Sequence, residues 1–234
     1  LEAEWEDEEE IIEIWNGSEV NKPKQSAEDP NIYEIVYPSE LAWLAAAVNG
    51  TLPETKAAPA PDTYAGKTFK LINNIDLDNH EWTPIGNKTN VFQGTFDGND
   101  KTVKNLLITG NNNYVGLFGF TTNGEIKNLT VENAKVSGRN SVGVVVGSPY
   151  TSKFTNITVK GHVEVNGKFY VGGVGGRNAY ADWTNVKVEA DETSYVNANS
   201  VEDGIAYRTY VGGVVGFNGE GGHSFKNITS NINW

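Results

Sequence analysis

The sequence has 234 residues and a formal net charge of -12, and residues 1–40 carry most of it, with 13 acidic and 2 basic side chains. No basic stripe is present, which disfavours nucleic-acid binding because neutralising phosphates requires one. The absence of Cys excludes disulfides and thiolate metal sites, and no apolar run approaches the roughly 18 residues of a membrane span.

The N-terminal segment, residues 1–30, is predicted to be a flexible acidic leader. It begins with EAEWEDEEE, Glu2 to Glu10, in which closely spaced carboxylates repel one another and favour solvation. A short apolar island at residues 11–18 interrupts the leader and is a candidate edge strand.

Residues 31–66 are predicted to cap one end of the fold with a strand, a helix and a loop. Alternating apolar residues from Tyr33 to Tyr37 indicate the strand, and Ser39 is the expected N-cap of the helix. Asn49-Gly50 is expected to end it. Apolar residues at helical spacing give this helix one apolar face: Leu41, Leu44, Ala45 and Val48.

From residue 67 onward, short strands alternate with Gly and Asn turns, giving first coils over residues 67–108 and repeats over residues 109–234. Five phrases, such as VKNLLI and IKNLTV, carry an Asn that interrupts an alternation of apolar and polar residues. Asn tolerates left-handed backbone, so each is expected at a corner, with its amide facing inward and stacked in a ladder. These structural residues are Asn105, Asn128, Asn156, Asn185 and Asn227.

A glycine-rich phrase alternates with the first and appears as YVGLFGF, SVGVVVG, YVGGVGG and YVGGVVG. A glycine-rich strand allows the backbone of a neighbouring element to approach closely, so the phrase is predicted to build the fold. A phosphate-binding loop is disfavoured because the phrase opens no helix and lacks a following GK[ST]. The closing glycines are Gly119, Gly147, Gly176 and Gly216.

These repeats predict an all-β fold, a right-handed parallel β-helix with one short N-terminal capping helix, in which residues 31–234 form a single domain. The phrases recur mostly at 28 or 29 residues. The longest spacing, 42 residues between Asn185 and Asn227, contains an insertion, Asp191–Arg208, which is expected to project as a loop. The protein is expected to be a monomer.

The glycine phrases resemble the GLUG motif, named for a Gly-Leu-any-Gly sequence that stands here at residues 116–119. Phe69–Ile108 is similar to the segment that precedes such repeats in gut-bacterial surface proteins of the Bacteroides type. The resemblance covers residues 31–234 and implies an adhesin-type surface protein, lipid-anchored at the outer membrane in its full-length form. Val144 departs from the pattern, since two sister phrases have Gly there.

GLUG repeats also accompany IgA-specific metallopeptidases. This chain has no HExxH, and its histidines, His80, His162 and His223, are scattered along the sequence. The resemblance therefore carries over neither peptidase chemistry nor any binding residue.

Two turns in the body concentrate carboxylates. A calcium site could draw its oxygen ligands from such tight loops. The favoured alternative is that Asp-Gly and Asn-Asp sequences simply build the turns, and no cofactor is expected. The residues concerned are Asp76, Asp78, Asp97, Asn99 and Asp100.

Aromatic residues in the turns and the insertion are the candidate ligand surface. Loops on one side of a solenoid usually carry its function. The structural alternative is that each ring packs at the rim of the fold. The candidate ligand-binding residues are Tyr150, Tyr180, Tyr195, Asn197, Asn199 and Tyr207.

The sequence therefore predicts a non-catalytic cell-surface protein that binds an extracellular protein or glycan. The first alternative is a glycan-active enzyme or an accessory carbohydrate-binding module. An enzyme would need two placed carboxylates, Asp97 with Asp100 or Glu132 with Glu164. A structural spacer is a further alternative.

Overall fold

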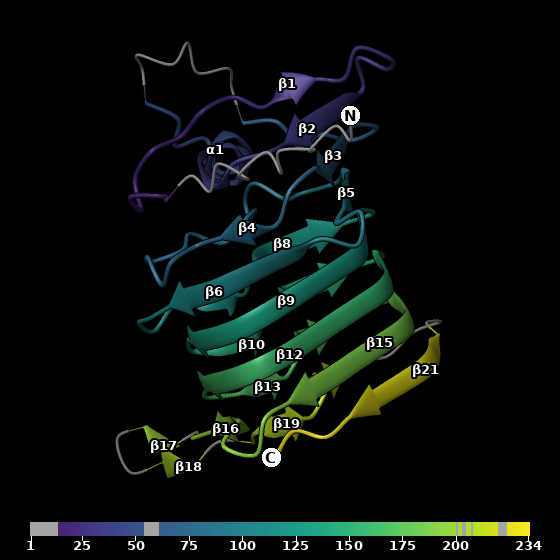
Figure 1. Ribbon diagram of the computed structural model, residues 1–234. Coiled ribbons are helices and arrows are strands. Elements are labelled where there is room, and N and C mark those ends of the chain that lie inside the picture. The colour runs from purple at the N-terminus through teal and green to yellow at the C-terminus, as the bar shows by residue number, and fades with distance from the viewer. Residues whose placement is uncertain (1–13, 54–60, 200, 203–204, 207, 220–223) are drawn as a thin grey trace, which may run out of the picture.

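The computed structural model describes residues 14–53, 61–199, 201–202, 205–206, 208–219 and 224–234. These residues form a parallel β-solenoid of about five turns with a single short helix, as the repeats predicted (Figure 1). The elements are β1 (Lys24–Gln25), β2 (Ile32–Ile35), α1 (Pro38–Asn49), β3 (Thr68–Leu71), β4 (Ile75–Asp76), β5 (Thr95–Asp97), β6 (Thr102–Ile108), β7 (Asn113–Val115), β8 (Phe118–Thr122), β9 (Glu125–Ser137), β10 (Asn140–Gly143), β11 (Val146–Tyr150), β12 (Lys153–Gly167), β13 (Tyr170–Gly172), β14 (Gly175–Asn178), β15 (Asp182–Ala190), β16 (Tyr195–Ala198), β17 (Val201–Glu202), β18 (Ile205–Ala206), β19 (Tyr210–Gly212), β20 (Val215–Asn218) and β21 (Phe225–Ser230).

Three sheets run along the solenoid. The long sheet contains β2, β3, β5, β9, β12, β15 and β21 in parallel, and β4, β6 and β16 join it further along its strands. The second sheet contains β7, β10, β13 and β19, and the third contains β8, β11, β14 and β20. One coil passes through each sheet in turn, as β9, β10 and β11 do before β12 begins the next coil.

Side chains of one kind stack between coils in the core. Ile126, Phe154, Trp183 and Phe225 are in register across β9, β12, β15 and β21. The rings of Phe154 and Trp183 lie parallel, with centroids 4.2 Å apart. The first three are fully buried, whereas Phe225 on the last of these strands is 38% exposed. Each coil thus covers the apolar layer of the coil before it.

Long strands bend at what we call the first corner, which is formed by Asn128, Asn156, Asn185 and Asn227. These residues have left-handed φ values between 51° and 56°. Each Nδ2 donates to the Oδ1 of the preceding ladder member at 2.8–2.9 Å, and Asn128 donates to Asp97 at 3.0 Å.

The ladder faces solvent, and the prediction that its amides point into the core is wrong. Asn156, Asn185 and Asn227 are exposed, and Asn128 is partly buried. A left-handed residue reverses the alternation of the strand, so the Asn projects outward while the apolar residue after it, such as Ile157, points inward.

Asn105 belongs to a second corner and not to the ladder of Asn128, so that part of the predicted alignment is wrong. β6 pairs with the second half of β9, which sets Val103 opposite Val131. Asn105 therefore lies level with Asn133, and both have left-handed φ values, 60° and 54°. Its amide donates to Asp76 at 2.8 Å. Asn105 and Asn133 are 28 residues apart, one coil length, whereas Asn128 lies only 23 residues beyond Asn105.

The closing glycines lie where coils meet backbone on backbone. A Cβ on Gly147 would clash with the backbone of Tyr114 and Val115, which belongs to the second sheet of the preceding coil. The second and third sheets therefore approach too closely for a side chain at this position. Added Cβ atoms meet backbone in the same way at Gly119, Gly176 and Gly216.

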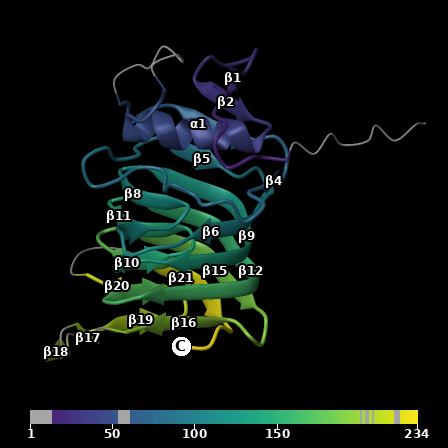
Figure 2. The ribbon, with the colours of Figure 1, turned by 90° about the vertical axis from the view of Figure 1, so that its left-hand side faces the viewer.

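Helix α1 lies across the N-terminal end of the solenoid and covers its first coil (Figure 2). Leu41, Leu44 and Val48 on the predicted apolar face have no exposed surface. The open end of a sheet stack invites edge-to-edge association, and the helix protects this one.

The helix starts at Pro38 with Tyr37 as its N-cap, two residues before the predicted N-cap Ser39. The carboxylate of Glu40 accepts the backbone N–H of Tyr37 at 3.1 Å and so satisfies a group at the helix start. Gly50 ends the helix with a φ of 71°, as predicted.

The second half of the expected leader packs on the fold. Trp15 is 4% exposed and meets Trp82 edge to face, with centroids 5.9 Å apart. β1 pairs antiparallel with β2. Residues 14–18 of the candidate edge strand form no strand, and the acidic run of residues 1–13 lies outside the described residues.

The insertion is partly built into the solenoid, contrary to the expected loop. β16 pairs in parallel with β12, which aligns Tyr195 with Glu164 and Val196 with Val165. In the described part of the insertion, the antiparallel pair β17 and β18 extends away from the stack (Figure 1).

Candidate functional site

The first corner lines an open polar groove of about 520 Å³, which we call the ladder groove. Thr130, Thr158, Lys187 and Asp100 border the row of amides. An Asn amide offers two donors and two acceptor lone pairs, and the ladder uses one of each. The remaining hydrogen-bonding capacity forms a row that repeats once per coil.

Tyr150 and Tyr180 form an exposed aromatic pair at the corner where the third sheet leads into the long sheet. They are 44% and 43% exposed, and their rings meet edge to face with centroids 5.6 Å apart. A bridge between Tyr150 and Ala179 sets the two rings on consecutive coils. Coil stacking thus brings two predicted ligand residues together.

A smaller polar groove of about 290 Å³ begins beside this pair. Its lining includes Asn123, Glu125, Thr151 and Lys153, and Thr151 directly follows Tyr150. Lys153 begins β12, and the ladder residue of the same strand follows three residues later, about 10 Å along it. The two grooves therefore lie along one stretch of the long sheet, and the tyrosine pair stands at the turns that lead into it.

Tyr195 and Asn197 lie elsewhere, on β16. Tyr195 is aligned with Glu164, eleven residues beyond the start of β12, a path of about 36 Å. Tyr195 and Asn197 are therefore not part of one surface with Tyr150.

The remaining predicted ligand residues are Asn199, which is exposed just after the end of β16, and Tyr207. The backbone N–H of Asn199 donates to Gly167 at 2.9 Å and continues the pairing of β16. Tyr207 lies outside the described residues.

Beside Tyr195, at the second corner, His162 lies between two carboxylates; we call His162, Glu164 and Asp191 the histidine cluster. Nε2 lies 3.0 Å from Glu164 Oε1, and Nδ1 lies 3.2 Å from Asp191 Oδ2. Lys135 Nζ lies 3.0 Å from the other oxygen of Glu164, to which the Tyr195 hydroxyl donates at 3.4 Å. Between Lys160 and Val163, β12 has one more residue than the paired stretch of β9. His162 lies in this extra-residue segment.

The turn after β15 is tied to the cluster through Asp191. Its Oδ1 accepts the backbone N–H of Thr193 at 3.0 Å and the hydroxyls of Thr193 and Ser194 at 2.8 Å. Ser194 Oγ in turn accepts the backbone N–H of Val163 at 2.9 Å. These contacts join the turn to β12.

The charges of the cluster shift one another's pKa values. The hydrogen bond to Glu164, with that to Asp191, raises the pKa of His162 above its ordinary 6.5. His162 and Lys135 lower the pKa of Glu164, and Glu164 raises that of Lys135. The hydroxyls of Ser194 and Thr193 lower the pKa of Asp191 to about 2.

The cluster has the order of a nucleophile, a base and an acid, but its hydroxyl and its ring are both engaged with carboxylates. Thr193 Oγ1 lies 3.0 Å from His162 Nδ1, and Glu164 lies at Nε2. The Thr193 hydroxyl donates to Asp191 instead, and the two carboxylates favour a protonated imidazole. His162 in this state cannot accept the proton of Thr193.

Three of the four carboxylates considered for an enzyme form ion pairs among the described residues, and Asp100 is the exception. Glu132 pairs with Lys160 at 3.2 Å, and Asp97 pairs with Lys127 at 3.8 Å. Glu164 is held by Lys135 and His162 as above.

Asp76 and Asp97, the first of the expected calcium ligands, begin two similar turns. Each Oδ1 accepts the backbone N–H two residues on, from Asp78 and Asn99, at 2.9 Å. Asp76 also pairs with Lys104 at 3.3 Å, and its pKa is lowered by its hydrogen bonds despite partial burial.

The two turns are not brought together. Asp76 aligns with Lys104, which faces Glu132, whereas Asp97 faces Lys127, five residues earlier on β9, a path of about 16 Å along the strand. Asp100 lines the ladder groove instead. Within the described ranges, no group of three His, Asp or Glu side chains is placed to hold a metal ion.

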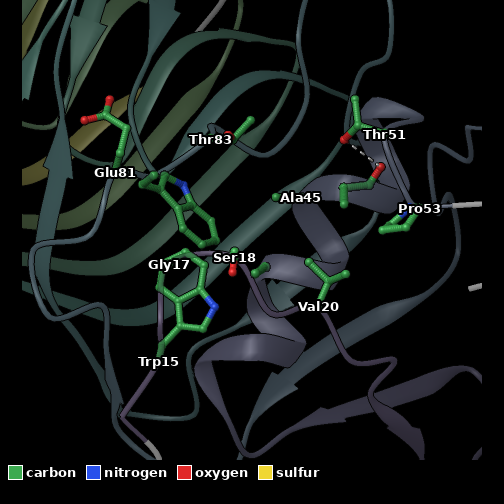
Figure 3. A pocket seen from close by; sticks show the side chains of 12 residues that line it. Trp15, Gly17, Ser18, Val20, Ala45, Thr51, Pro53, Glu81 and Thr83 are labelled. Atoms are coloured by element: carbon green, nitrogen blue, oxygen red, sulfur yellow. Dashed lines mark hydrogen bonds between the residues drawn. The ribbon is translucent and has the colours of Figure 1, made fainter.

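A pocket of about 230 Å³ lies between helix α1 and the N-terminal segment (Figure 3). Trp15, Val20, Ala45 and Pro53 give it an apolar lining, and the carboxylate of Glu81 points away from Trp15. Glu81 instead accepts hydrogen bonds from the backbone and hydroxyl of Thr109. Since Trp15 is almost fully buried, this pocket offers little ring surface to a ligand.

The histidine cluster is not apparent from a search for local motifs, because its residues are far apart in the sequence. His162 and Asp191 are 29 residues apart, which is one coil length. That spacing places them side by side in a solenoid, and it was the signal available in the sequence. His80 lies 3.9 Å from Asp78, and His223 lies outside the described residues.

Two curated proteins are similar to parts of the chain, and no protein-family model matches it. Halomucin of Haloquadratum walsbyi is 36% identical over 138 residues, which is 54% of this chain and 2% of halomucin. A "Putative Gly-rich membrane protein" of Evansella cellulosilytica is 31% identical over 96 residues, or 36% of this chain and 11% of that protein. The chain thus spans a small fraction of either relative.

Among solved structures, a "putative immunoglobulin A1 protease" from Bacteroides ovatus has a TM-score of 0.47 and 16% identity, and the match covers 92% of this chain and 74% of that one. In the described part of the chain, no helix is long and apolar enough to cross a bilayer.

Proposed function

We propose that this chain is a non-catalytic extracellular repeat module that binds a glycan at a cell surface. The observation that carries the proposal is the half-exposed Tyr150–Tyr180 pair beside a polar groove. The C–H faces of sugar rings pack on aromatic rings, while their hydroxyls exchange hydrogen bonds with amides, hydroxyls and lysines. A site of this kind needs an apolar platform and a few convergent polar groups, and this corner has both.

The ladder groove extends this surface along the same strands. Its amides and threonines both donate and accept hydrogen bonds, as sugar hydroxyls do. Glycan recognition is therefore preferred to recognition of a charged polymer.

The relatives support a place at the cell surface. One is named halomucin and another is named a membrane protein, and both are similar over a stretch of this chain. Lipid anchoring of the full-length protein and an adhesive role remain part of this proposal, as the resemblance to GLUG-motif proteins implies.

A glycan and mucin array followed by calorimetry with the best glycan tests the proposal. Tyr150→Ala and Tyr180→Ala should each weaken binding by about tenfold, because each removes half of the platform. Trp234→Ala is the matched control, since Trp234 is 78% exposed and carries no predicted contact with the glycan. Undiminished binding by both tyrosine variants, with unchanged circular dichroism, would exclude this site.

The spacer and enzyme alternatives give different results in the same assay. A spacer binds no glycan on the array, whereas an enzyme shortens a bound glycan over time. Chromatography of each glycan after incubation with the protein separates the enzyme from the binding module.

A further inference from the structure

The histidine cluster connects three segments that are far apart in the sequence. Lys135 comes from β9, His162 and Glu164 come from β12, and Asp191 comes from the turn that follows β15. The contacts run without a break from Lys135 through Glu164 and His162 to Asp191. A side-chain bridge therefore joins successive coils at the point where the insertion begins.

Residues 191–198, which we call the insertion base, are attached to the solenoid by this bridge together with backbone pairing and the Ser194 contact to Val163. Asp191 binds His162 and closes the turn, and Tyr195 reaches Glu164. Beyond them, β16 holds to β12 through four aligned residue pairs. Val196 supplies the buried apolar contact of this short strand.

The bridge requires the charged form of His162. An imidazolium donates from both nitrogens, so it can satisfy Glu164 and Asp191 together. A neutral imidazole has one bare nitrogen, whose lone pair would face a carboxylate oxygen at 3.0 or 3.2 Å. One of the two contacts then becomes repulsive.

We propose that His162 is a proton-operated latch, which as an imidazolium holds the insertion base against the solenoid and on losing its proton releases it. The latch goes beyond the proposed glycan binding, because its residues lie far from the tyrosine pair. The latch determines whether β16, and with it the projecting β17–β18 pair, is held against the solenoid or released from it.

The charged groups around the His162 imidazole determine which protonation state of the ring is favoured. Glu164 and Asp191 favour the imidazolium, while Lys135 opposes it but is neutralised on the far oxygen of Glu164. Thr193, Tyr195 and Asn133 add uncharged contacts to the cluster, Asn133 by accepting the backbone N–H of His162.

The stability supplied by His162 is present below its ordinary pKa of 6.5 and is lost as the pH rises through its raised pKa. Glu164 and Asp191 have lowered pKa values. The stability that they supply is therefore present above their ordinary pKa values of 4.5 and 3.8, and it is lost only as the pH falls through the lowered values. The latch is therefore closed between pH 4.5 and pH 6.5. It opens as the pH rises further and His162 loses its proton.

Hydrogen exchange of the whole chain, followed by mass spectrometry and corrected for intrinsic rates, tests the latch. Amides of residues 191–198 should lose protection several-fold between about pH 5.5 and about pH 8.5, while those of β9 should not. His162→Gln should abolish this pH dependence. His80→Gln is the matched control and should retain it, because His80, whose Nε2 lies 3.9 Å from Asp78, is outside the histidine cluster.

A second measurement, the NMR titration of the His162 ring, addresses the bridge directly. Glu164→Gln and Asp191→Asn should each shift its titration to lower pH. Equal protection of residues 191–198 at both pH values would overturn the proposal. So would a pH dependence that survives in His162→Gln, or a His162 titration that neither carboxylate variant moves.

Discussion

The two corners of the long strands use the same left-handed turn in opposite ways. At the first corner, four coils in succession place Asn, and each amide bonds the next. At the second corner, Asn105 and Asn133 give way to Gly161, which is followed by an extra residue, His162. The repeated corner joins coils by one uniform contact, whereas the varied corner carries a cluster of charges specific to one place. Uniformity along a solenoid thus marks what stacking requires, and departure from it marks a local role.

Breaking the uniform corner should have the largest effect. Asn156→Val should lower the free energy of unfolding by about 2–4 kcal/mol, since a β-branched residue resists left-handed backbone and two ladder hydrogen bonds are lost. Urea denaturation measures this change.

Asn156→Gly separates the two causes. Glycine accepts the left-handed φ of 56°, so this variant should lose only the amide contacts, about 1–2 kcal/mol. If both variants cost the same, backbone geometry does not explain why Asn recurs at the first corner.

Breaking the varied corner should have an intermediate effect. Gly161 has a φ of 75°, and a Cβ there would clash with Asn133 Oδ1, so Gly161→Ala should cost about 1–3 kcal/mol. Adding Asn133→Gly removes the clashing atom and should make the pair less than additive in a double-mutant cycle. Strict additivity would show that the clash relaxes without cost.

Making the border of the first corner uniform, with Thr on all three strands, should have the smallest effect. Thr130, Thr158 and Lys187 occupy equivalent positions on β9, β12 and β15. Lys187→Thr should change the free energy of unfolding by less than about 0.5 kcal/mol, because the side chain is exposed and has no partner of opposite charge among the described contacts. A loss larger than this would assign Lys187 a structural role in the groove.

The parallel solenoid, the helical cap and the coil length were predictable because they depend on patterns repeated along the chain. The alignment of Asn105 was not, because both corners place an Asn before an apolar residue. Strand register alone distinguishes them, and it sets Val103 beside Val131. The outward direction of the ladder required the φ values, which reverse the alternation that the sequence pattern assumed.

The candidate sites were predictable only in part. Tyr150 and Tyr180 were named from their turn positions, and stacking at one coil length made them a pair. Tyr195 was assigned to a loop because the insertion interrupts the repeat, yet its strand joins the long sheet. The histidine cluster depends on one extra residue in β12, which no pattern of apolar residues reveals.

The close backbone contacts at the closing glycines also limit how such a chain can change its length over evolution. The backbone of Tyr114 and Val115 leaves room only for glycine at position 147. A residue added within the glycine phrase would place a side chain there, and every later coil would lose register. Changes in length are therefore expected as whole coils, or at turns and strands outside the glycine phrases, as in the 42-residue interval between Asn185 and Asn227. Among the described coils, both departures from a uniform 28-residue repeat, the extra residue in β12 and the insertion after β15, lie outside the glycine phrases.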